Sequence, residues 1–343
     1  MTTADAGPRS FELETKLGCG SVGEVWRAQL DGRMVAVKLI NDPANARQRH
    51  SLETELQALG CLEHPAIPAL YGSDLEGERP YIVMEYIPGE PFHRLIAEGG
   101  IWHIPLEQRL TILDQIAGAV AHSHARGLIH RDIKPANIIG IEQPHLIDFG
   151  IAAEPGVTVT PAGTPFYMFP GDQLPSPAHD AFGFALTAYE LLFGVHPLFT
   201  AQDGGLARDE VCALARQRLA DQQWRVPSRI AAHEVPYDLR GVDLPQLDAL
   251  FAAAFDWQAA APLMPSELVA ALRTLVLTPD NQPYREAMPQ MLAPTVDHSA
   301  DLPGTSTLHP EATARWEWPT MLLTSVIGVV TAIVLFIALQ NAF

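Results

Sequence analysis

The hydrophobic pattern of this chain changes its character near Pro88. From residue 11 to residue 86 the apolar residues fall in short β-prone runs, at 23–30, 34–40 and 81–86. One stretch in this part, Gln48 to Leu62, has the spacing of a helix instead. After Pro88 helical spacing dominates up to residue 276. The sequence therefore predicts an α+β fold, with a small β-rich N-lobe at 11–86 and a larger α-helical C-lobe at 89–276.

Composition narrows the classes of function that fit this fold. Hydrophobic residues make up 48% of the 343 residues and charged residues 18%, which suits a folded protein with a sizeable core. The formal net charge is -18 with only 22 lysines and arginines, so nucleic acid is not expected as a partner. The three cysteines are far apart and lack CxxC spacing, which predicts neither a disulfide framework nor a thiolate zinc site.

The C-terminal part has a different composition. Residues 277–315 are rich in proline, threonine, serine and aspartate, and we interpret them as a flexible linker. Met321 to Leu339 is uncharged and mostly apolar, and as a helix it would reach roughly 28 Å, about the thickness of a bilayer core. We predict a single transmembrane helix at 321–339, a buried core helix being the alternative. Gly328 and Ala332 are four residues apart in this span, which is not a strong small-xxx-small dimer motif but leaves a homodimer open.

Glycines at 18, 20 and 23, followed by Val25, form a GxGxxGxV pattern within a β-prone hairpin. Glycines in such a loop let backbone amides approach phosphate groups without a side-chain clash. A strand-like run follows the loop, whereas a dinucleotide-binding fingerprint would open a helix. A glycine-rich turn without any ligand is the alternative interpretation.

Lys38 lies within a Val-Ala-Val-Lys run that we predict to be an inner strand. A buried ammonium group is costly unless a carboxylate accompanies it. Glu55, on the predicted helix, is the partner we expect, and this pair would hold Lys38 toward the α- and β-phosphates of a nucleotide. The alternative is a lysine whose stem packs while its head reaches solvent.

The segment from His130 to Asn137 reads His-Arg-Asp-Ile-Lys-Pro-Ala-Asn, and Asp148-Phe-Gly150 begins eleven residues after Asn137. This set of groups suits phosphoryl transfer, which needs a positioned hydroxyl, a proton acceptor and metal ions. We predict that Asp132 accepts the hydroxyl proton and that Lys134 steadies the phosphoryl group. Asn137 and Asp148 supply the oxygen ligands that Mg²⁺ prefers.

These motifs together resemble those of the eukaryotic-like, or Hanks-type, protein kinase family, over residues 11–276. The resemblance implies a bilobal protein-kinase fold that binds ATP and Mg²⁺. Lys134 within this catalytic loop is similar to the serine/threonine class, which implies phosphorylation of serine and threonine hydroxyls on proteins. Because ATP is cytoplasmic, the resemblance and the predicted span together imply a single-pass membrane protein with a cytoplasmic kinase domain and a C-terminal anchor.

The resemblance also assigns roles to residues outside the motifs. Met84 is similar to the family's gatekeeper residue, and Glu85 to Ile87 is similar to the hinge whose backbone bonds adenine. Val25 and Ala36 would enclose the adenine ring. Leu17 is implied as a further ATP-binding residue, Thr164 as the threonine that bridges the catalytic Asp132 and Lys134, and Asp180 as the aspartate that braces the catalytic loop.

The chain departs from the family pattern at the end of the activation segment, 148–170. Phe169-Pro-Gly171 stands where the family has Ala-Pro-Glu, and the arginine that pairs with that glutamate is missing as well, because no arginine occurs between Arg240 and Arg273. Losing both members of a buried ion pair can be nearly neutral, unlike losing one. The departure leaves the phosphate and metal groups untouched and puts the rigidity of the substrate side in question.

Three hypotheses accompany this interpretation. Thr158 and Thr160 are candidates for autophosphorylation, with the phosphate bound by Arg131, and two unmodified threonines are the alternative. A catalytically silent pseudokinase that acts as a membrane-tethered scaffold is an alternative function, against which the intact Lys38 and Asp132 argue. A kinase of small molecules is a second alternative, but such enzymes often have a different catalytic-loop sequence.

Overall fold

The computed structural model describes residues 11–19, 22–159, 162–171, 174–230 and 242–277. These residues all belong to one compact unit of the chain. Among them no helix is both long enough and apolar enough to cross a membrane. The helix predicted at 321–339 lies outside the described residues, as does the predicted linker beyond residue 277.

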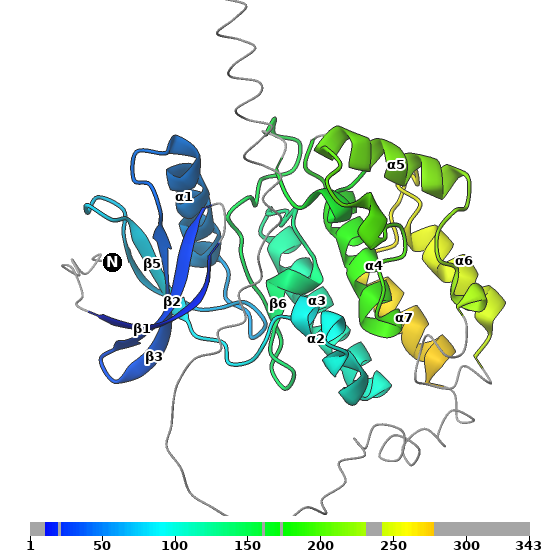
Figure 1. Cartoon of the computed structure of the whole chain (residues 1–343), viewed down its shortest axis with the longest axis horizontal. Helices are drawn as coiled ribbons and strands as arrows, with labels where there is room; N and C mark the ends of the chain where they lie inside the picture. Colours follow the sequence, from blue (N-terminus) through cyan, green and yellow to red (C-terminus); the bar gives the residue numbers. More distant parts are fainter. Residues whose placement is uncertain (1–10, 20–21, 160–161, 172–173, 231–241, 278–343) are drawn as a thin grey trace, which may run out of the picture. The chain divides into compact units, whose positions relative to one another are not determined.

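The N-lobe is a five-stranded antiparallel sheet with one helix, α1 (Figure 1). The strands are arranged in the order β1-β2-β3-β5-β4. Their bounds, with that of the helix, are β1 (Glu12–Cys19), β2 (Gly23–Leu30), β3 (Arg33–Ile40), α1 (Ala46–Cys61), β4 (Leu70–Asp74) and β5 (Tyr81–Glu85). The strands at 23–30, 34–40 and 81–86 and the helix predicted at 48–62 are thereby confirmed to within two residues.

β3 shows why Lys38 reaches the inside of the molecule. Successive side chains of a strand point to opposite faces of the sheet. Val35, Val37 and Leu39 enter a small apolar cluster on one face. Ala36 and Ile40 enter the main core on the other face, and Lys38 shares their side by alternation. The strand register places Lys38 opposite both Val25 of β2 and Ile82 of β5.

The C-lobe is mainly helical, and α3, α4 and α7 pack against one another in its centre (Figure 1). A short hairpin, β6 with β7, follows the catalytic loop. The bounds are α2 (Phe92–Ala97), α3 (Leu106–Ala125), β6 (Ile138–Ile139), β7 (His145–Leu146), α4 (Pro177–Phe193), α5 (Arg208–Ala220), α6 (Leu244–Ala254) and α7 (Pro265–Val276). Five short 3-10 helices occupy Gly100–His103, Pro135–Asn137, Pro165–Tyr167, Ala201–Asp203 and Pro227–Arg229.

α4 is the centre of the C-lobe because nearly all of its residues are buried, from Asp180 to Phe193. Its last turn ends against Arg109 of α3, which is itself buried and donates from Nη1 to the carbonyl oxygens of Leu191 (2.9 Å) and Leu192 (3.2 Å). A positive charge at a helix C-terminus satisfies free carbonyls and complements the helix dipole. The C-terminal end of α4 is therefore held against α3.

Candidate active site

Lys38, Glu55 and Asp148 form one ion-paired group, in which Lys38 and Glu55 are buried and Asp148 is partly exposed, although they come from β3, α1 and the segment after β7. The Lys38 Nζ donates to Glu55 Oε2 at 2.5 Å and to Asp148 Oδ1 at 2.9 Å. The predicted pairing of Lys38 with Glu55 is confirmed, and Asp148 is a second partner that was not expected in it. Glu55 is only 2% exposed, so its charge depends on Lys38.

Charge and burial oppose each other in this group. Burial disfavours the Lys38 ammonium, but the carboxylates of Asp148 and Glu55 outweigh it and raise the pKa of Lys38. The Lys38 ammonium lowers the pKa of Asp148 to about 2, although partial desolvation of this half-exposed carboxylate works the other way. Burial removes water from Glu55 and raises its pKa. The Lys38 ammonium lowers this pKa, but only in part, so the net shift is upward. Asp148 and Lys38 therefore carry their charges at neutral pH.

A hydrogen bond joins α1 to the Asp148-Phe-Gly150 motif directly. The buried Ser51 hydroxyl, one turn before Glu55 on α1, donates to the Gly150 carbonyl oxygen at 2.8 Å. Asp148 itself has a left-handed backbone with φ 67°, which is uncommon for a residue other than glycine. The position of α1 and the conformation of this motif are thus coupled, and sequence reasoning did not identify Ser51.

Asp132, Lys134, Asn137 and Thr164 converge on one point in the C-lobe. Lys134 Nζ donates to Asp132 Oδ2 at 2.6 Å and also to the Thr164 hydroxyl. The Thr164 backbone N–H donates to Asp132 Oδ1 at 2.9 Å. Asn137 Nδ2 donates to Asp132 twice, to its carbonyl oxygen at 2.8 Å and to Oδ2 at 3.1 Å. The structure thus places Thr164 between Asp132 and Lys134, as the family resemblance implied.

Asp180 braces the catalytic loop from the N-terminal turn of α4. It is fully buried, and its carboxylate accepts the backbone N–H groups of His130 (2.8 Å) and Arg131 (2.7 Å). Arg131 has φ 70°, and these two bonds hold the loop in that conformation. Burial works against the charge of Asp180, but hydrogen bonds to the His124 ring and the Arg131 N–H lower its pKa below the usual range.

The histidines near the catalytic loop contact other protein groups and support the local structure. His124 Nε2 lies 2.7 Å from Asp180 Oδ2, a contact that the sequence did not indicate. His130 accepts the Asp132 N–H at Nδ1 (3.2 Å), and its Nε2 lies 3.1 Å from the Ile147 carbonyl oxygen. The His122 ring lies tilted against the His64 ring, with centroids 5.2 Å apart. Among the described residues no group of three acidic, histidine or cysteine side chains is arranged to hold a metal ion.

The predicted nucleotide-binding residues of the N-lobe fall into two sets. Val25, Ala36 and Met84 lie on adjoining strands, and Ala36 is directly opposite Met84 in the sheet. In the glycine loop, Gly20 lies outside the described residues, and no atom of the described residues stands within 4 Å of a Cβ built on Gly18. Space at Gly18 therefore remains for a ligand's phosphates. Leu17 of β1, which is 41% exposed, precedes this loop.

Gly23 has a structural reason to be glycine. A Cβ at this position would lie 1.9 Å from the carbonyl oxygen of Leu39 in β3, which precedes Ile40, the residue opposite Gly23. Real Cβ atoms do not approach that closely, so the strand pairing excludes any larger residue. The GxGxxG pattern therefore contains at least one glycine that the sheet requires independently of phosphate binding.

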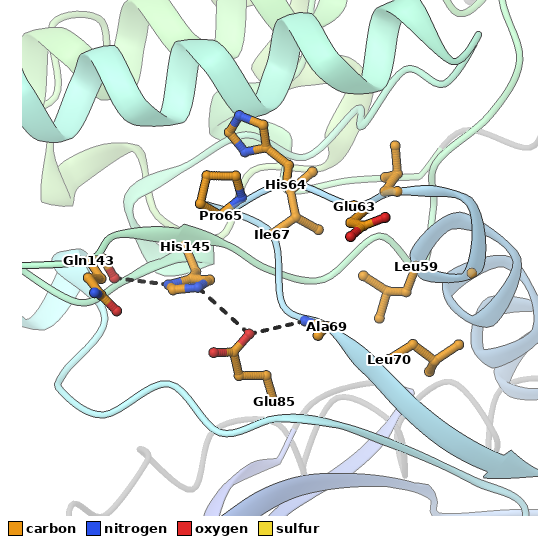
Figure 2. Close-up of a pocket in the computed structure, with 12 residues that line it drawn as sticks. Leu59, Glu63, His64, Pro65, Ile67, Ala69, Leu70, Glu85, Gln143 and His145 are labelled. Carbon is orange, nitrogen blue, oxygen red and sulfur yellow. Dashed lines mark hydrogen bonds and ion pairs between the residues drawn. The ribbon is translucent and has the colours of Figure 1, made fainter.

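Glu85 and Ile87 belong to the segment between the lobes, and the Glu85 side chain faces away from the Met84 side chain because neighbouring strand residues alternate. Its carboxylate accepts the Ala69 N–H at 3.2 Å and lies 3.9 Å from His145 Nε2. Figure 2 shows these contacts at the edge of a pocket of about 770 Å³. Of the predicted nucleotide-binding residues, only Glu85 lines this pocket, so a nucleotide role for Glu85 rests on its backbone.

The end of the activation segment is held without the missing ion pair. Arg216 of α5 donates from Nη1 to the Pro170 carbonyl oxygen at 2.8 Å. The Tyr167 hydroxyl donates to the buried Glu190 of α4 at 2.6 Å. The Phe169 ring packs against His179 with centroids 4.7 Å apart. These contacts replace the expected glutamate-arginine pair, so the segment is anchored at several points despite that loss.

The family model described as the protein kinase domain matches residues 11–284. This chain belongs to the protein kinase family. Serine/threonine-protein kinase PknA of Mycobacterium tuberculosis is 33% identical to it over 215 residues, covering 57% of this chain and 49% of PknA. Serine/threonine-protein kinase PkaA of Streptomyces coelicolor is 36% identical over 215 residues, covering 54% of the chain and 39% of PkaA. Calcium/calmodulin-dependent protein kinase type 1 of Caenorhabditis elegans is 31% identical over 210 residues, covering 57% and 60%.

The chain spans about half the length of the curated relatives that it matches. The matched residues include both lobes, so the small β-rich lobe and the larger helical lobe of the kinase fold are those observed here.

The kinase site contains a pair of oxygen ligands that fit Mg²⁺. Both amide hydrogens of Asn137 are directed at Asp132, so its side-chain oxygen points the opposite way. Asp148 uses Oδ1 for Lys38, and its side chain is still 43% exposed. A carboxylate and an amide oxygen are hard donors of the kind that Mg²⁺ selects. When bound, the metal ion would neutralise charge on the phosphates of ATP.

Proposed function

We propose that this kinase transfers the γ-phosphoryl group of ATP to serine and threonine hydroxyls of proteins. The observation that carries the proposal is the convergence of Lys134, Asn137 and Thr164 on the Asp132 carboxylate. The names of the bacterial relatives, serine/threonine-protein kinases PknA and PkaA, support the serine/threonine assignment.

Asp132 would accept the proton of the substrate hydroxyl as its oxygen attacks the γ-phosphorus and the bond to the bridging oxygen breaks, releasing ADP. The Lys134 ammonium, 2.6 Å from Asp132 Oδ2, lies where it could neutralise charge on the group in transit. Lys38, held by Glu55, would bind the α- and β-phosphates. Asn137 and Asp148 would hold Mg²⁺ by their side-chain oxygens. Thr164 keeps Asp132 and Lys134 in register.

The protein can be tested as a full-length preparation with radiolabelled ATP, magnesium and a generic protein substrate. We expect label on serine and threonine, and loss of transfer in the Asp132→Asn variant. Equal binding of ATP by this variant would show that the fold survives. Transfer to no protein would favour the pseudokinase scaffold, and transfer to small metabolites alone would favour a small-molecule kinase.

We further propose that residues 321–339 anchor the kinase in a membrane, with its catalytic domain in the cytoplasm. The support is the uncharged apolar run itself, with Trp316 and Trp318 before it at the position of a headgroup region. Expressed full-length protein should stay in the membrane pellet after alkaline extraction, while a variant with three leucines of the span changed to arginine should not. Release of both proteins would refute the anchor.

A homodimer through the span would appear as cross-linked dimers that Gly328→Ile removes.

A further inference from the structure

Two arginines of α5 face the activation segment. Arg208, Cys212 and Arg216 are spaced at intervals of four residues, which places them on one stripe of the helix. Arg216 Nη1 donates to the Pro170 carbonyl oxygen at 2.8 Å, and Arg208 Nη2 approaches the Gly163 carbonyl oxygen at 3.4 Å. The same stripe thus meets the segment at two points, one near its end and one beside Thr164.

The two arginines differ in how well their hydrogen-bond donors are satisfied. The Arg216 bond has an ordinary hydrogen-bond length, whereas 3.4 Å is at the outer limit for the bond of Arg208. The second terminal nitrogen of Arg208, Nη1, is buried and has no hydrogen-bond partner among the described residues. A buried guanidinium donor without an acceptor is unfavourable. Arg216 therefore acts as a tether, and Arg208 retains a donor for a ligand.

Arg208 lies close to the reacting groups. Its contact, Gly163, directly precedes Thr164, and a Cβ built on Gly163 would stand 3.7 Å from Asp132 Oδ1 and 3.2 Å from the Arg131 carbonyl oxygen. Burial lowers the pKa of Arg131, the nearby carboxylate of Asp180 raises it in part, and the positive charge of Arg208 lowers it further. Two guanidinium groups therefore share this region, which favours an anion between or beside them.

The carboxylates nearby do not supply that anion. Glu210 of α5 caps the helix by accepting the Ala207 N–H at 2.7 Å. Asp209 is exposed on the same turn, and no hydrogen bond or ion pair joins it to Arg208 among the described residues. Asp132 is already engaged by Lys134, Asn137 and Thr164. Among the described residues no group accepts from Arg208 Nη1, so this donor is available to an anion that approaches it.

We propose that Arg208 is a specificity-determining residue that binds an anionic side chain, carboxylate or phosphate, close to the serine or threonine that accepts the phosphoryl group. This inference rests on the proposed protein-kinase function. It specifies the substrates as proteins with an anionic residue near the acceptor serine or threonine. The net charge of -18 would favour basic substrates at long range. At physiological salt, charges more than about 8 Å apart are largely screened, so the local guanidinium governs the neighbouring substrate position.

The test uses peptides with one acceptor threonine and one variable position, which carries aspartate, phosphoserine or asparagine. The variable position is placed in turn at each site from three residues before the threonine to three residues after it. With full-length protein we expect kcat/KM to be about tenfold to a hundredfold higher for the anionic peptides at one such position, as for a charge-assisted hydrogen bond. In Arg208→Ala and Arg208→Gln this ratio should fall to about one. Arg216→Ala is the matched control on the same stripe, and it should lower kcat for all peptides while the ratio persists.

Binding of the aspartate and asparagine peptides, measured by fluorescence anisotropy, separates recognition from the chemical step and needs only folded protein. The aspartate peptide should bind more tightly to the wild-type protein and lose that advantage in both Arg208 variants. A wild-type enzyme that phosphorylates peptides without any charge preference would overturn the inference and leave the proposed function intact. A preference that disappears in Thr158→Ala would also overturn it, because the anion would then come from the kinase itself. Absence of transfer to every peptide and protein would refute the proposed function, and this inference with it.

Discussion

Glu190 should make the stability of this kinase depend on pH in the neutral range. The side chain lies in α4, the residue is 7% exposed, and it accepts the Tyr167 hydroxyl at 2.6 Å. No lysine or arginine pairs with it among the described residues. Burial raises the pKa of Glu190 from 4.5 to about 7, although the Tyr167 hydrogen bond lowers it in part. We propose to replace it by glutamine, which keeps an oxygen acceptor for Tyr167 and cannot ionise.

The sign follows from the raised pKa. Below pH 4.5 the carboxyl is protonated in both the folded and the unfolded chain, so its contribution to stability is fully present. As pH rises toward 7, the unfolded chain releases its proton first, and the folded state loses stability. Above pH 7 the loss is complete. The difference between 7 and 4.5 is about 2.5, and at about 1.4 kcal/mol for each pKa unit the full loss is about 3.5 kcal/mol.

The assay is urea unfolding of full-length wild-type and Glu190→Gln protein, followed by tryptophan fluorescence at pH 5 and pH 8. Burying the glutamine amide changes the free energy of unfolding by the same amount at both pH values. The informative quantity is therefore how the difference in unfolding free energy between variant and wild type changes from pH 5 to pH 8. We expect the variant to gain about 2 to 3 kcal/mol relative to wild type between pH 5 and pH 8. Glu78→Gln removes an exposed carboxyl and serves as the control. An unchanged difference at the two pH values would refute the assignment.

Three further changes test other contacts. Lys38→Met leaves the buried Glu55 without its ammonium, so we expect loss of phosphoryl transfer and, by urea unfolding at pH 8, about 3 to 5 kcal/mol lower stability. Asp180→Asn weakens charge-assisted bonds to the catalytic loop, worth about 1.5 to 3 kcal/mol each, and should lower kcat more than it raises KM in steady-state assays. Gly171→Ala places a Cβ 2.3 Å from the Phe169 ring and should lower the melting temperature in a thermal scan; an unchanged melting temperature would contradict that packing.

The sequence predicted those parts of the fold that have a local signature. β2, β3 and β5 are half or wholly buried, and their runs of apolar residues are visible in the chain. β1 was not predicted as a separate strand, although Leu13 and Leu17 alternate with charged residues along it. Every one of its residues is exposed, so burial does not mark it either. β4 was missed as well, because it has only five residues and includes Gly72.

The site, like the fold, has parts with a local sequence signature and parts without one. Asp132, Lys134 and Asn137 are within six residues of one another, so their spacing indicates their chemistry directly. Glu55 could be paired with Lys38 because a buried ammonium on a strand requires a carboxylate. The bonds from Arg216 to Pro170 and from Tyr167 to Glu190 join residues 46 and 23 positions apart. No short motif encodes such contacts, since they depend on how α5 and α4 pack.

The loss of the glutamate at position 171 follows from the way this segment is packed. The Phe169 ring lies between His179 and Phe182, with centroids at 4.7 and 6.0 Å, and its edge fills the space where a side chain of residue 171 would begin. Glycine is therefore the residue that this packing accepts. Arg216 donates to the backbone carbonyl of Pro170, which is an acceptor whatever the neighbouring side chains are. Anchoring through a carbonyl removes the need for a carboxylate at 171, and with it the need for the paired arginine further along the chain.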